Sequence, residues 1–394
     1  MSRPLNARRT HGVDKNVWVE FTQLAADYKP VNLGQGFPDF SPPPFIQEAF
    51  CKAVSGGPSM HQYTRAFGHP PLVKIGAYQA LFSACQAVVD DGDEVIVVEP
   101  FFDCYKPMVL MAGGTPVYVP LRPSSSIQSS GDWVLSAEEL SSKITPRTKA
   151  IMINTPNNPL GKVFKTEELQ MIADLCIKHN LLCISDEVYE WLTYDGAEHV
   201  KIASLPGMWE RTITIGSAGK TFSATGWKVG WAIGSRHVMK YIKTIHQNTV
   251  YHCATAAQEA VAHGFDREYE LFGTPESYFQ QLPALLQQKR KRLALCLESV
   301  GLKPIMPEGG YFIMADISSF NDENTKDEPY DFRFVKWLIK EKGLATIPVS
   351  AFYSSEHSKD FEKYIRFCFV KDSTLNDAEA ILRKWSQEQQ NSSM

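Results

Sequence analysis

The chain has 394 residues and a formal net charge of −4; 44% of its residues are hydrophobic and 21% are charged. This is the composition of an ordinary globular protein, long enough for one large and one smaller domain. The small net charge gives no reason to expect nucleic acid or an anionic membrane as a partner.

The N-terminal segment and the cysteines indicate in which cellular compartment the protein functions. The first residues are basic but lack the apolar stretch of a secretory signal, and no apolar run is long enough to span a bilayer. The eight cysteines include no C-x-x-C pair. We expect reduced thiols buried as small hydrophobic residues, with neither a disulfide framework nor a metal site, and a cytoplasmic protein.

From residue 78 onward, helical and strand-like patterns alternate along the chain. Amphipathic periodicity predicts helices over 78–89, 166–179 and 238–247. Apolar runs rich in β-branched residues predict strands over 94–98, 115–119, 150–154, 181–185 and 212–215. Such continuous runs are typical of strands buried on both faces. The sequence thus predicts an α/β fold, with a mostly parallel sheet wrapped by helices, in a large domain over 46–285.

After about residue 278 the pattern changes and predicts a smaller α+β domain. A long helix over 279–299 is followed by two apolar strand-like segments, 309–314 and 364–369. We assign this domain to residues 1–45 plus 286–394. Two further segments are expected to be irregular, namely a charged surface loop over 318–329 and a disordered polar tail over 386–394.

A polar loop directly follows the predicted strand 150–154. It runs from Asn154 to Lys162 and contains Asn157, Asn158 and Gly161. Loops at the carboxyl edge of a parallel sheet commonly bind ligands. The same residue types also form ordinary turns, so the loop by itself leaves both interpretations open.

Asp186 and Tyr189 follow the next predicted strand. An ionised aspartate at this edge is suited to pair with the N–H of a pyridinium ring, because a carboxylate keeps that nitrogen protonated. The alternatives are an N-cap role for Asp186 at the start of a short helix and an ordinary half-buried aromatic for Tyr189. If the chain is helical here, Tyr189 shares the face of Asp186.

The segment 217–231 is the most informative part of the chain. Lys220 lies among small residues just beyond the predicted strand 212–215, and a second lysine, Lys228, follows it. This arrangement suits a phosphorylated aldehyde cofactor, with one lysine for the aldehyde and with Lys228 and a serine for the phosphate. An ATP-binding P-loop is excluded, because Thr214 occupies the position of the first glycine of that motif.

Arg366 is an isolated arginine in the apolar segment 364–369. A guanidinium group in such a strand requires a partner. A substrate carboxylate bound through two parallel hydrogen bonds is one candidate, and a structural salt bridge is the alternative.

Together and in this order, these features resemble the fold-type I pyridoxal-phosphate aminotransferases, in particular the branch that acts on kynurenine and glutamine. The resemblance runs through nearly the whole chain, and the Lys220 segment is its most specific part. It also includes NLGQGFPDF at 32–40, QYTR at 62–65 and PFFDCY at 100–105.

The resemblance implies how the cofactor, pyridoxal 5′-phosphate, would be held. Lys220 would form a Schiff base with its aldehyde and then act as the base and acid of catalysis, while Asp186 would pair with the pyridine nitrogen. Asn158 and Tyr189 would hydrogen-bond the phenolic oxygen. Phe102 would stack on the ring, and the phosphate would be bound by Ser217, Lys228 and the backbone N–H groups of Gly76 and Ala77.

The resemblance also implies substrate contacts and a homodimer with shared active sites. Arg366 would bind the substrate carboxylate, with help from Asn158 and from the backbone at Gly36. An aromatic side-chain pocket would be formed by Trp18, Tyr251 and His252, although an isolated histidine can equally be an ordinary core residue. Tyr63 would reach the phosphate in the partner subunit.

The implied activity is transamination of L-kynurenine, L-glutamine and aromatic amino acids with a 2-oxo acid acceptor. A cysteine-S-conjugate β-lyase side activity would follow, because the same carbanion can expel a good leaving group at Cβ. Two alternatives stand beside it. One is a variant that is inactive or acts only by dimerising with full-length subunits, and the other is a lyase that mainly performs β-elimination.

The first alternative arises from a departure from the family pattern between Lys74 and Gly76. The family places one helix and one strand there, which require roughly 17 residues, whereas this chain has only Ile75. The sequences on both sides match well, so we expect one helix and one strand of the large domain to be missing. Their loss would remove packing and expose backbone hydrogen-bonding groups.

Overall fold

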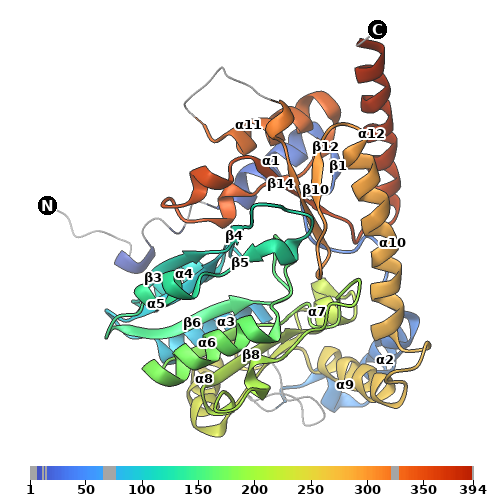
Figure 1. Ribbon diagram of the computed structural model, residues 1–394. Coiled ribbons are helices and arrows are strands. Elements are labelled where there is room, and N and C mark those ends of the chain that lie inside the picture. The colour runs from blue at the N-terminus through green and yellow to red at the C-terminus, as the bar shows by residue number, and fades with distance from the viewer. Residues whose placement is uncertain (1–6, 11–12, 14–15, 65–76, 321–327, 393–394) are drawn as a thin grey trace, which may run out of the picture.

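The computed structural model describes residues 7–10, 13, 16–64, 77–320 and 328–392. Its centre is a six-stranded sheet with the order β3-β2-β6-β7-β8-β9 (Figure 1). The strands are β2 (Glu94–Glu99), β3 (Thr115–Pro120), β6 (Thr148–Asn154), β7 (Leu182–Asp186), β8 (Thr212–Ser217) and β9 (Gly230–Gly234). All pairs are parallel except β8 with β9. The predicted α/β fold is confirmed, and the five predicted strands match within two residues.

Helices cover both faces of this sheet, which explains the continuous apolar runs. Successive strand residues point to opposite faces, so Val95 and Val97 of β2 pack on one side and Ile96 and Val98 on the other. The first side is covered by α3 (Ala77–Val88), α4 (Tyr105–Met111) and α8 (Arg236–Thr249). The second side is covered by α5 (Ala137–Ser142) and α6 (Thr166–His179).

A second, antiparallel sheet lies above the first in Figure 1 and has the order β10-β11-β14-β13. Its strands are β10 (Lys303–Ile305), β11 (Phe312–Asp316), β14 (Tyr364–Cys368) and β13 (Ile347–Pro348). Around it lie α1 (Val17–Tyr28), α11 (Tyr330–Trp337), α12 (Ser373–Ser392) and the short pair β1 (Val31–Asn32) and β12 (Leu344–Ala345). The strands β4 (Arg122–Pro123) and β5 (Trp133–Val134) form another short, antiparallel pair.

The helix α10 (Tyr278–Glu298) runs along one side of the molecule past both sheets (Figure 1). At its start, Phe279 packs in a cluster with α2 (Pro44–Val54) and α9 (Thr255–Glu270). Further along, Leu286, Leu293 and Leu297 join the core of the second sheet. One helix therefore contributes to both apolar cores.

The tail predicted to be disordered is helical as far as Ser392, so that prediction is wrong. Leu382 and Trp385 are buried in the core of the second sheet, and the Trp385 ring lies 5.5 Å from those of Phe320 and Trp337. Beyond them, Ser386 Oγ donates to the carbonyl of Ser299 at 2.8 Å. The polar composition of the tail concealed a helix that is held in place by two apolar side chains.

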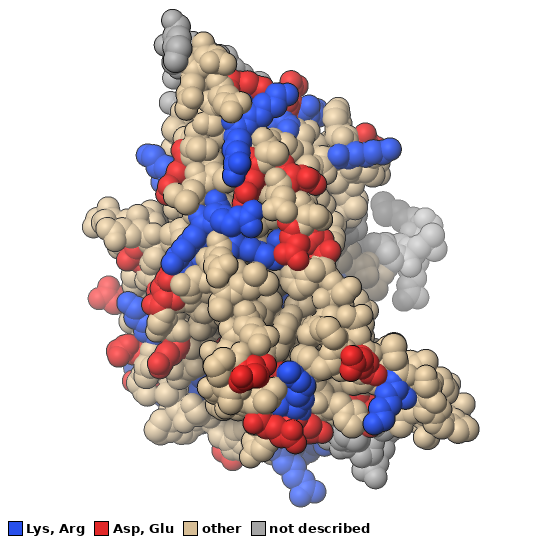
Figure 2. All heavy atoms as spheres, turned by 90° about the vertical axis from the view of Figure 1, so that its right-hand side faces the viewer, with Lys and Arg blue, Asp and Glu red and all other residues tan. Residues whose placement is uncertain are grey.

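The face formed by α10 and α12 carries positive and negative side chains interspersed with one another (Figure 2). Arg292 of α10, for example, pairs with Glu379 of α12 at 2.9 Å. A single-sign patch of the kind that binds polyanions is not formed on this face of the described chain. Among the helices of the described residues, none has the length and apolar character that a membrane crossing requires.

Candidate active site

A cavity of about 690 Å³ opens at the carboxyl ends of β6, β7 and β8, where the second sheet approaches the first. Ligands commonly bind at this edge of a parallel sheet. The cavity brings together most of the residues predicted from the sequence, namely Trp18, Gly36, Ala77, Phe102, Asn158, Asp186, Tyr189, Ser217, Lys220, Lys228 and Arg366.

Lys220 lies in the short helix α7 (Ala218–Thr221), directly after β8. Its Nζ donates to the hydroxyl of Tyr311 at 2.5 Å and to the carbonyl of Gly36 at 3.3 Å. Burial lowers the pKa of Lys220 to about 8, with Arg366 acting in the same direction and Asp186 in the opposite one. A lysine in this state is close to the balance between ammonium and free amine at neutral pH, as proton transfer and imine formation require.

Asp186 ends β7 and is 3% exposed. Its Oδ2 accepts a hydrogen bond from the Tyr105 hydroxyl at 2.5 Å, and its Oδ1 accepts from the backbone N–H of Val188 at 3.3 Å. Burial raises the pKa of Asp186 to about 6, although the Tyr105 hydrogen bond opposes this shift. The residues after it form a turn, so the N-cap alternative for Asp186 is wrong.

The backbone of Asp186 is held from the neighbouring strand. Asn154 Nδ2 and the N–H of Thr155 both donate to the Asp186 carbonyl at 3.0 Å. Asn154 Oδ1 in turn accepts from the N–H of Asn158 at 2.7 Å. The polar loop after β6 is therefore a turn as well as a wall of the cavity, and it fixes Asp186 and Asn158 relative to one another.

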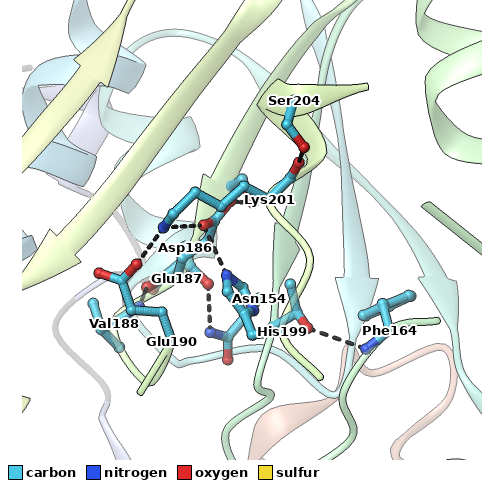
Figure 3. A network of polar contacts seen from close by, with 11 residues as sticks. Asn154, Phe164, Asp186, Glu187, Val188, Glu190, His199, Lys201 and Ser204 are labelled. Carbon is cyan, nitrogen blue, oxygen red and sulfur yellow. Dashed lines mark hydrogen bonds and ion pairs between the residues drawn. The ribbon is translucent and has the colours of Figure 1, made fainter. Parts of the chain in front are cut away.

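A buried ionic network lies directly behind Asp186 (Figure 3). The carboxylate of Glu187, which is fully buried, accepts from Ser185 Oγ at 2.9 Å and lies 2.9 Å from His199 Nε2 and 3.2 Å from Lys201 Nζ. Lys201 also pairs with Glu190. Lys201 thus pairs with both carboxylates, which raise its pKa.

Arg366, in β14, is 1% exposed and lines the same cavity. Its guanidinium donates to Asn158 Oδ1 at 2.7 Å and to the carbonyl of Gly34 at 2.6 Å, while its Nε has no hydrogen-bond partner. Within the described chain no carboxylate forms an ion pair with it, so these residues give no support to the salt-bridge alternative. Burial lowers the pKa of Arg366 to about 10, and the group remains charged at neutral pH. A buried cation without a counter-ion is suited to an anionic ligand.

Another group of residues that line the cavity is suited to bind a phosphate group. The N-terminus of α3, a twelve-residue helix, contributes Ala77, Tyr78 and Gln79 to the wall, and helix N-termini attract anions. Ser217 and Lys228 line the same cavity. Gly76 lies outside the described residues, as does the shortened segment between Lys74 and Gly76.

The predicted aromatic residues divide into two groups. Trp18 and Phe102 line the cavity, whereas Tyr63, Tyr251 and His252 form a separate cluster beside it, with the Tyr63 ring 5.7 Å from that of Tyr251. Tyr63 is 81% exposed. His252 is only partly buried, and its Nδ1 lies 2.7 Å from the carbonyl of Cys253, so it is not a core histidine.

Two tyrosines at the site were not predicted as site residues. Tyr105 and Tyr311 are almost fully buried, and their hydroxyl groups contact Asp186 and Lys220. Tyr105 lies in the quoted motif PFFDCY and Tyr311 in the predicted strand-like segment 309–314, but neither pattern shows where a hydroxyl points. The sequence offered only a general indication of their role, since the hydroxyl of any buried tyrosine usually has a hydrogen-bond partner.

Comparison with known proteins identifies the family of the chain. The family pattern "Aminotransferase class I and II" matches residues 28–382. Kynurenine--oxoglutarate transaminase 1 of Mus musculus is 55% identical over 423 positions, which cover 99% of this chain and 100% of the relative. Kynurenine--oxoglutarate transaminase of Dictyostelium discoideum is 43% identical, with 96% of each chain covered.

Solved structures show the same relationship in three dimensions. The crystal structure of Bna3p, a putative kynurenine aminotransferase from Saccharomyces cerevisiae, superimposes with a TM-score of 0.90 at 32% identity, covering 98% of this chain and 100% of that one. Aspartate aminotransferase from Thermus thermophilus with maleate gives a TM-score of 0.82 at 28% identity, with 98% of each chain covered. The chain therefore belongs to the class I and II aminotransferases, enzymes that use pyridoxal 5′-phosphate as their cofactor.

Proposed function

We propose that this aminotransferase transfers the amino group of L-kynurenine, L-glutamine and aromatic amino acids to a 2-oxo acid. The observation that carries the proposal is the presence of Lys220, Asp186 and Arg366 on one cavity that is also lined by Trp18 and Phe102. Kynurenine--oxoglutarate transaminases 1 and 3 of Homo sapiens, both 55% identical to the chain, support this choice of substrate.

The substrate carboxylate would bind to Arg366. The Nε of this guanidinium has no hydrogen-bond partner, and no carboxylate of the described chain forms an ion pair with it, although Asp103 lies near enough to interact with its charge. Asn158 Oδ1 and the Gly34 carbonyl fix the orientation of its two terminal nitrogens. The substrate carboxylate would therefore bind to a guanidinium group whose orientation is already fixed. This binding would place the α-carbon of the substrate between Arg366 and Lys220.

The bound cofactor supplies an electron-poor pyridinium ring that accepts the electron pair left when the α-proton is removed. Asp186 would keep the ring nitrogen protonated. Its neighbour Tyr105 favours the ionised carboxylate by donating a hydrogen bond to Oδ2. A cation bound beside Asp186 would lower its pKa further.

Lys220 would act as the base that removes the α-proton and as the acid that returns it. Its pKa of about 8 allows both forms to be populated near neutral pH. Asn158 and Tyr189 would hydrogen-bond the phenolic oxygen of the cofactor and Phe102 would stack on its ring. The phosphate would be bound by Ser217, Lys228 and the N-terminus of α3 with Gly76 and Ala77. Lys220 would thus bind the aldehyde of the cofactor and Lys228 its phosphate.

We also propose a cytoplasmic homodimer in which Tyr63 reaches the phosphate of the partner subunit. The exposure of Tyr63 beside the cavity supports this role. Tyr251 and His252, which adjoin the cavity-lining residues Val250 and Cys253, would shape the mouth of the substrate pocket. The division into domains 46–285 and 1–45 plus 286–394 is part of the same proposal.

The shortened segment between Lys74 and Gly76 bears on the alternative of an inactive variant. The alignment with the mouse relative has 423 positions, 29 more than this chain has residues, so the relative contains at least 29 residues without a counterpart here. That number exceeds the roughly 17 residues of an average helix plus strand. The difference in length supports the prediction that one helix and one strand are missing. It therefore also supports the alternative of a variant that is inactive or acts only by dimerising with full-length subunits.

One set of assays tests these proposals. The chain is expressed alone, its cofactor absorbance is recorded, and L-kynurenine and L-glutamine are each supplied with a 2-oxo acid. Consumption of both donors with formation of the matching 2-oxo products is expected. Release of pyruvate from a cysteine S-conjugate would reveal the β-lyase activity, and pyruvate without transamination would favour the lyase alternative. A soluble chain that binds no cofactor would favour the inactive variant.

A further inference from the structure

The hydroxyl of Tyr311 forms a closed set of polar contacts with Lys220. Lys220 Nζ donates to the Tyr311 oxygen at 2.5 Å, and the Tyr311 O–H donates to the carbonyl of Gly36 at 2.9 Å. The same carbonyl also accepts from Lys220 Nζ at 3.3 Å. The amino group of the lysine is thus bound at two points, both of which lie outside the six-stranded sheet and outside the helix α7 that contains Lys220.

The surrounding packing leaves the Tyr311 hydroxyl little freedom. Tyr311 is 2% exposed, its ring lies perpendicular to that of Tyr189 at 5.0 Å, and its carbonyl accepts from the N–H of Phe369 at 3.0 Å. A Cβ on Gly36 would lie 2.3 Å from the ring of Phe312, so the backbone at Gly36 is in close contact with this part of the core. Both partners of Lys220 are therefore fixed by the apolar core of the second sheet.

The direction of the hydrogen bonds follows from the charges. Burial raises the pKa of Tyr311 well above its usual value, so the phenol keeps its proton throughout the working range of pH. Its O–H donates to the Gly36 carbonyl, its oxygen accepts from Lys220 Nζ, and the Tyr189 hydroxyl is a further hydrogen-bonding neighbour. An oxygen acceptor at this distance stabilises an ammonium group more than a neutral amine.

We propose that Tyr311 is a catalytic residue that holds the amino group of Lys220 whenever this lysine is not bonded to the cofactor, and that it stabilises the protonated form of the lysine. The proposal rests on the cofactor-bonding role proposed for Lys220. Tyr311 then determines the position of the Lys220 amino group in the cofactor-free chain. It also determines how readily this group loses its proton, which it must do before it can attack the aldehyde of the cofactor.

The test measures cofactor capture by the full chain from which the cofactor has been removed. Pyridoxal phosphate is added at a series of pH values, and the rate is followed by the absorbance of the imine. In the unchanged chain the rate should rise with pH through the pKa of Lys220, about 8. In Tyr311→Phe the midpoint should move to lower pH by about one unit, because a hydrogen bond to a charged group contributes about this much.

Other charged or titratable groups also face Lys220, and the substitution leaves them in place. They are Asp186 from β7, Tyr189 from the following turn, Lys228 from beyond α7, and Arg366 and Cys368 from β14. Tyr194→Phe is the matched control, since Tyr194 is a buried tyrosine of the same core whose hydroxyl donates to the carbonyl of Gly310. Its midpoint should equal that of the unchanged chain.

The outcomes separate this proposal from the one on which it rests. No capture by the unchanged chain, or capture by Lys220→Ala with the same absorbance, would overturn the role of Lys220. An unchanged midpoint in Tyr311→Phe, with Lys220→Ala inactive, would overturn the role of Tyr311 alone. If Tyr311→Phe does not fold, replacement of Tyr311 by 3-fluorotyrosine keeps the shape and weakens the acceptor. A smaller shift in the same direction is then expected, and no shift contradicts the proposal.

Discussion

The hydroxyl of Tyr105 donates a 2.5 Å hydrogen bond to Oδ2 of Asp186, and both side chains are buried. The two residues lie 81 positions apart in the sequence, at the start of α4 and at the end of β7. The bond stabilises the charged form of a carboxylate that burial would otherwise protonate. If Asp186 pairs with the cofactor ring as proposed, Tyr105 would help to maintain the charge of this carboxylate.

Tyr105→Phe should therefore shift the acid limb of the pH profile. Without the hydrogen bond the pKa of Asp186 rises, because the Tyr105 hydroxyl lowers it in the unchanged chain, so the carboxylate is lost at a higher pH. Hydrogen bonds to charged groups contribute about 1.5–3 kcal/mol, or about one to two pH units. The measurement is kcat/KM from pH 5 to 9. A profile that is lower at every pH but not displaced would contradict this role.

Asp186→Asn should stabilise the cofactor-free chain at neutral pH while abolishing its activity. The folded pKa of Asp186, about 6, lies above the ordinary value of 3.8, so the folded state binds more protons between these values. Stability is then lost as pH rises from about 4 to about 6. Two pKa units correspond to about 3 kcal/mol. Urea unfolding should show a gain of up to this size at pH 7 and almost none at pH 4.

Lys220→Ala should abolish transamination, because no other described lysine lies against both Gly36 and Tyr311. Lys228→Ala is the informative comparison. It should weaken cofactor affinity, measured by titration of the absorbance, yet keep turnover at saturating cofactor. Turnover of Lys220→Ala at the parental rate would refute the proposed mechanism.

Arg366→Lys should raise KM for the amino donor by tenfold or more while leaving the cofactor absorbance unchanged. The charge is kept, but a lysine cannot bind Asn158 and Gly34 while presenting two parallel donors to a carboxylate. Steady-state kinetics with L-kynurenine measure the effect. An unchanged KM would remove Arg366 from the substrate site.

Trp385→Ala should destabilise the chain by about 3 kcal/mol or more, because it leaves a cavity among Phe320, Trp337 and α10. Ser386→Ala, its neighbour, loses only an exposed hydrogen bond to Ser299 and should cost about 1 kcal/mol or less. Denaturant unfolding of the two variants provides the comparison. Equal, small effects would show that the C-terminal helix contributes little to the fold.

The sheet and its helices were largely predictable from the sequence. The strand 94–98 was visible because its apolar run faces helices on both sides, a local pattern with one structural explanation. The tail after Trp385 was not predictable in the same way, since its own residues are polar and its helix depends on burial of Leu382 and Trp385 against distant segments.

The same division holds at the site. The sequence by itself indicated the candidate site residues, because Lys220 and Asp186 lie at or just beyond the ends of strands and Arg366 is an isolated arginine within an apolar strand. Only the tertiary structure decided that Arg366 has no carboxylate partner within the described chain and that the hydroxyls of Tyr105 and Tyr311 point at Asp186 and Lys220. Hydrogen bonds depend on distances of a few tenths of an ångström between segments far apart in the chain, and such distances are set by packing.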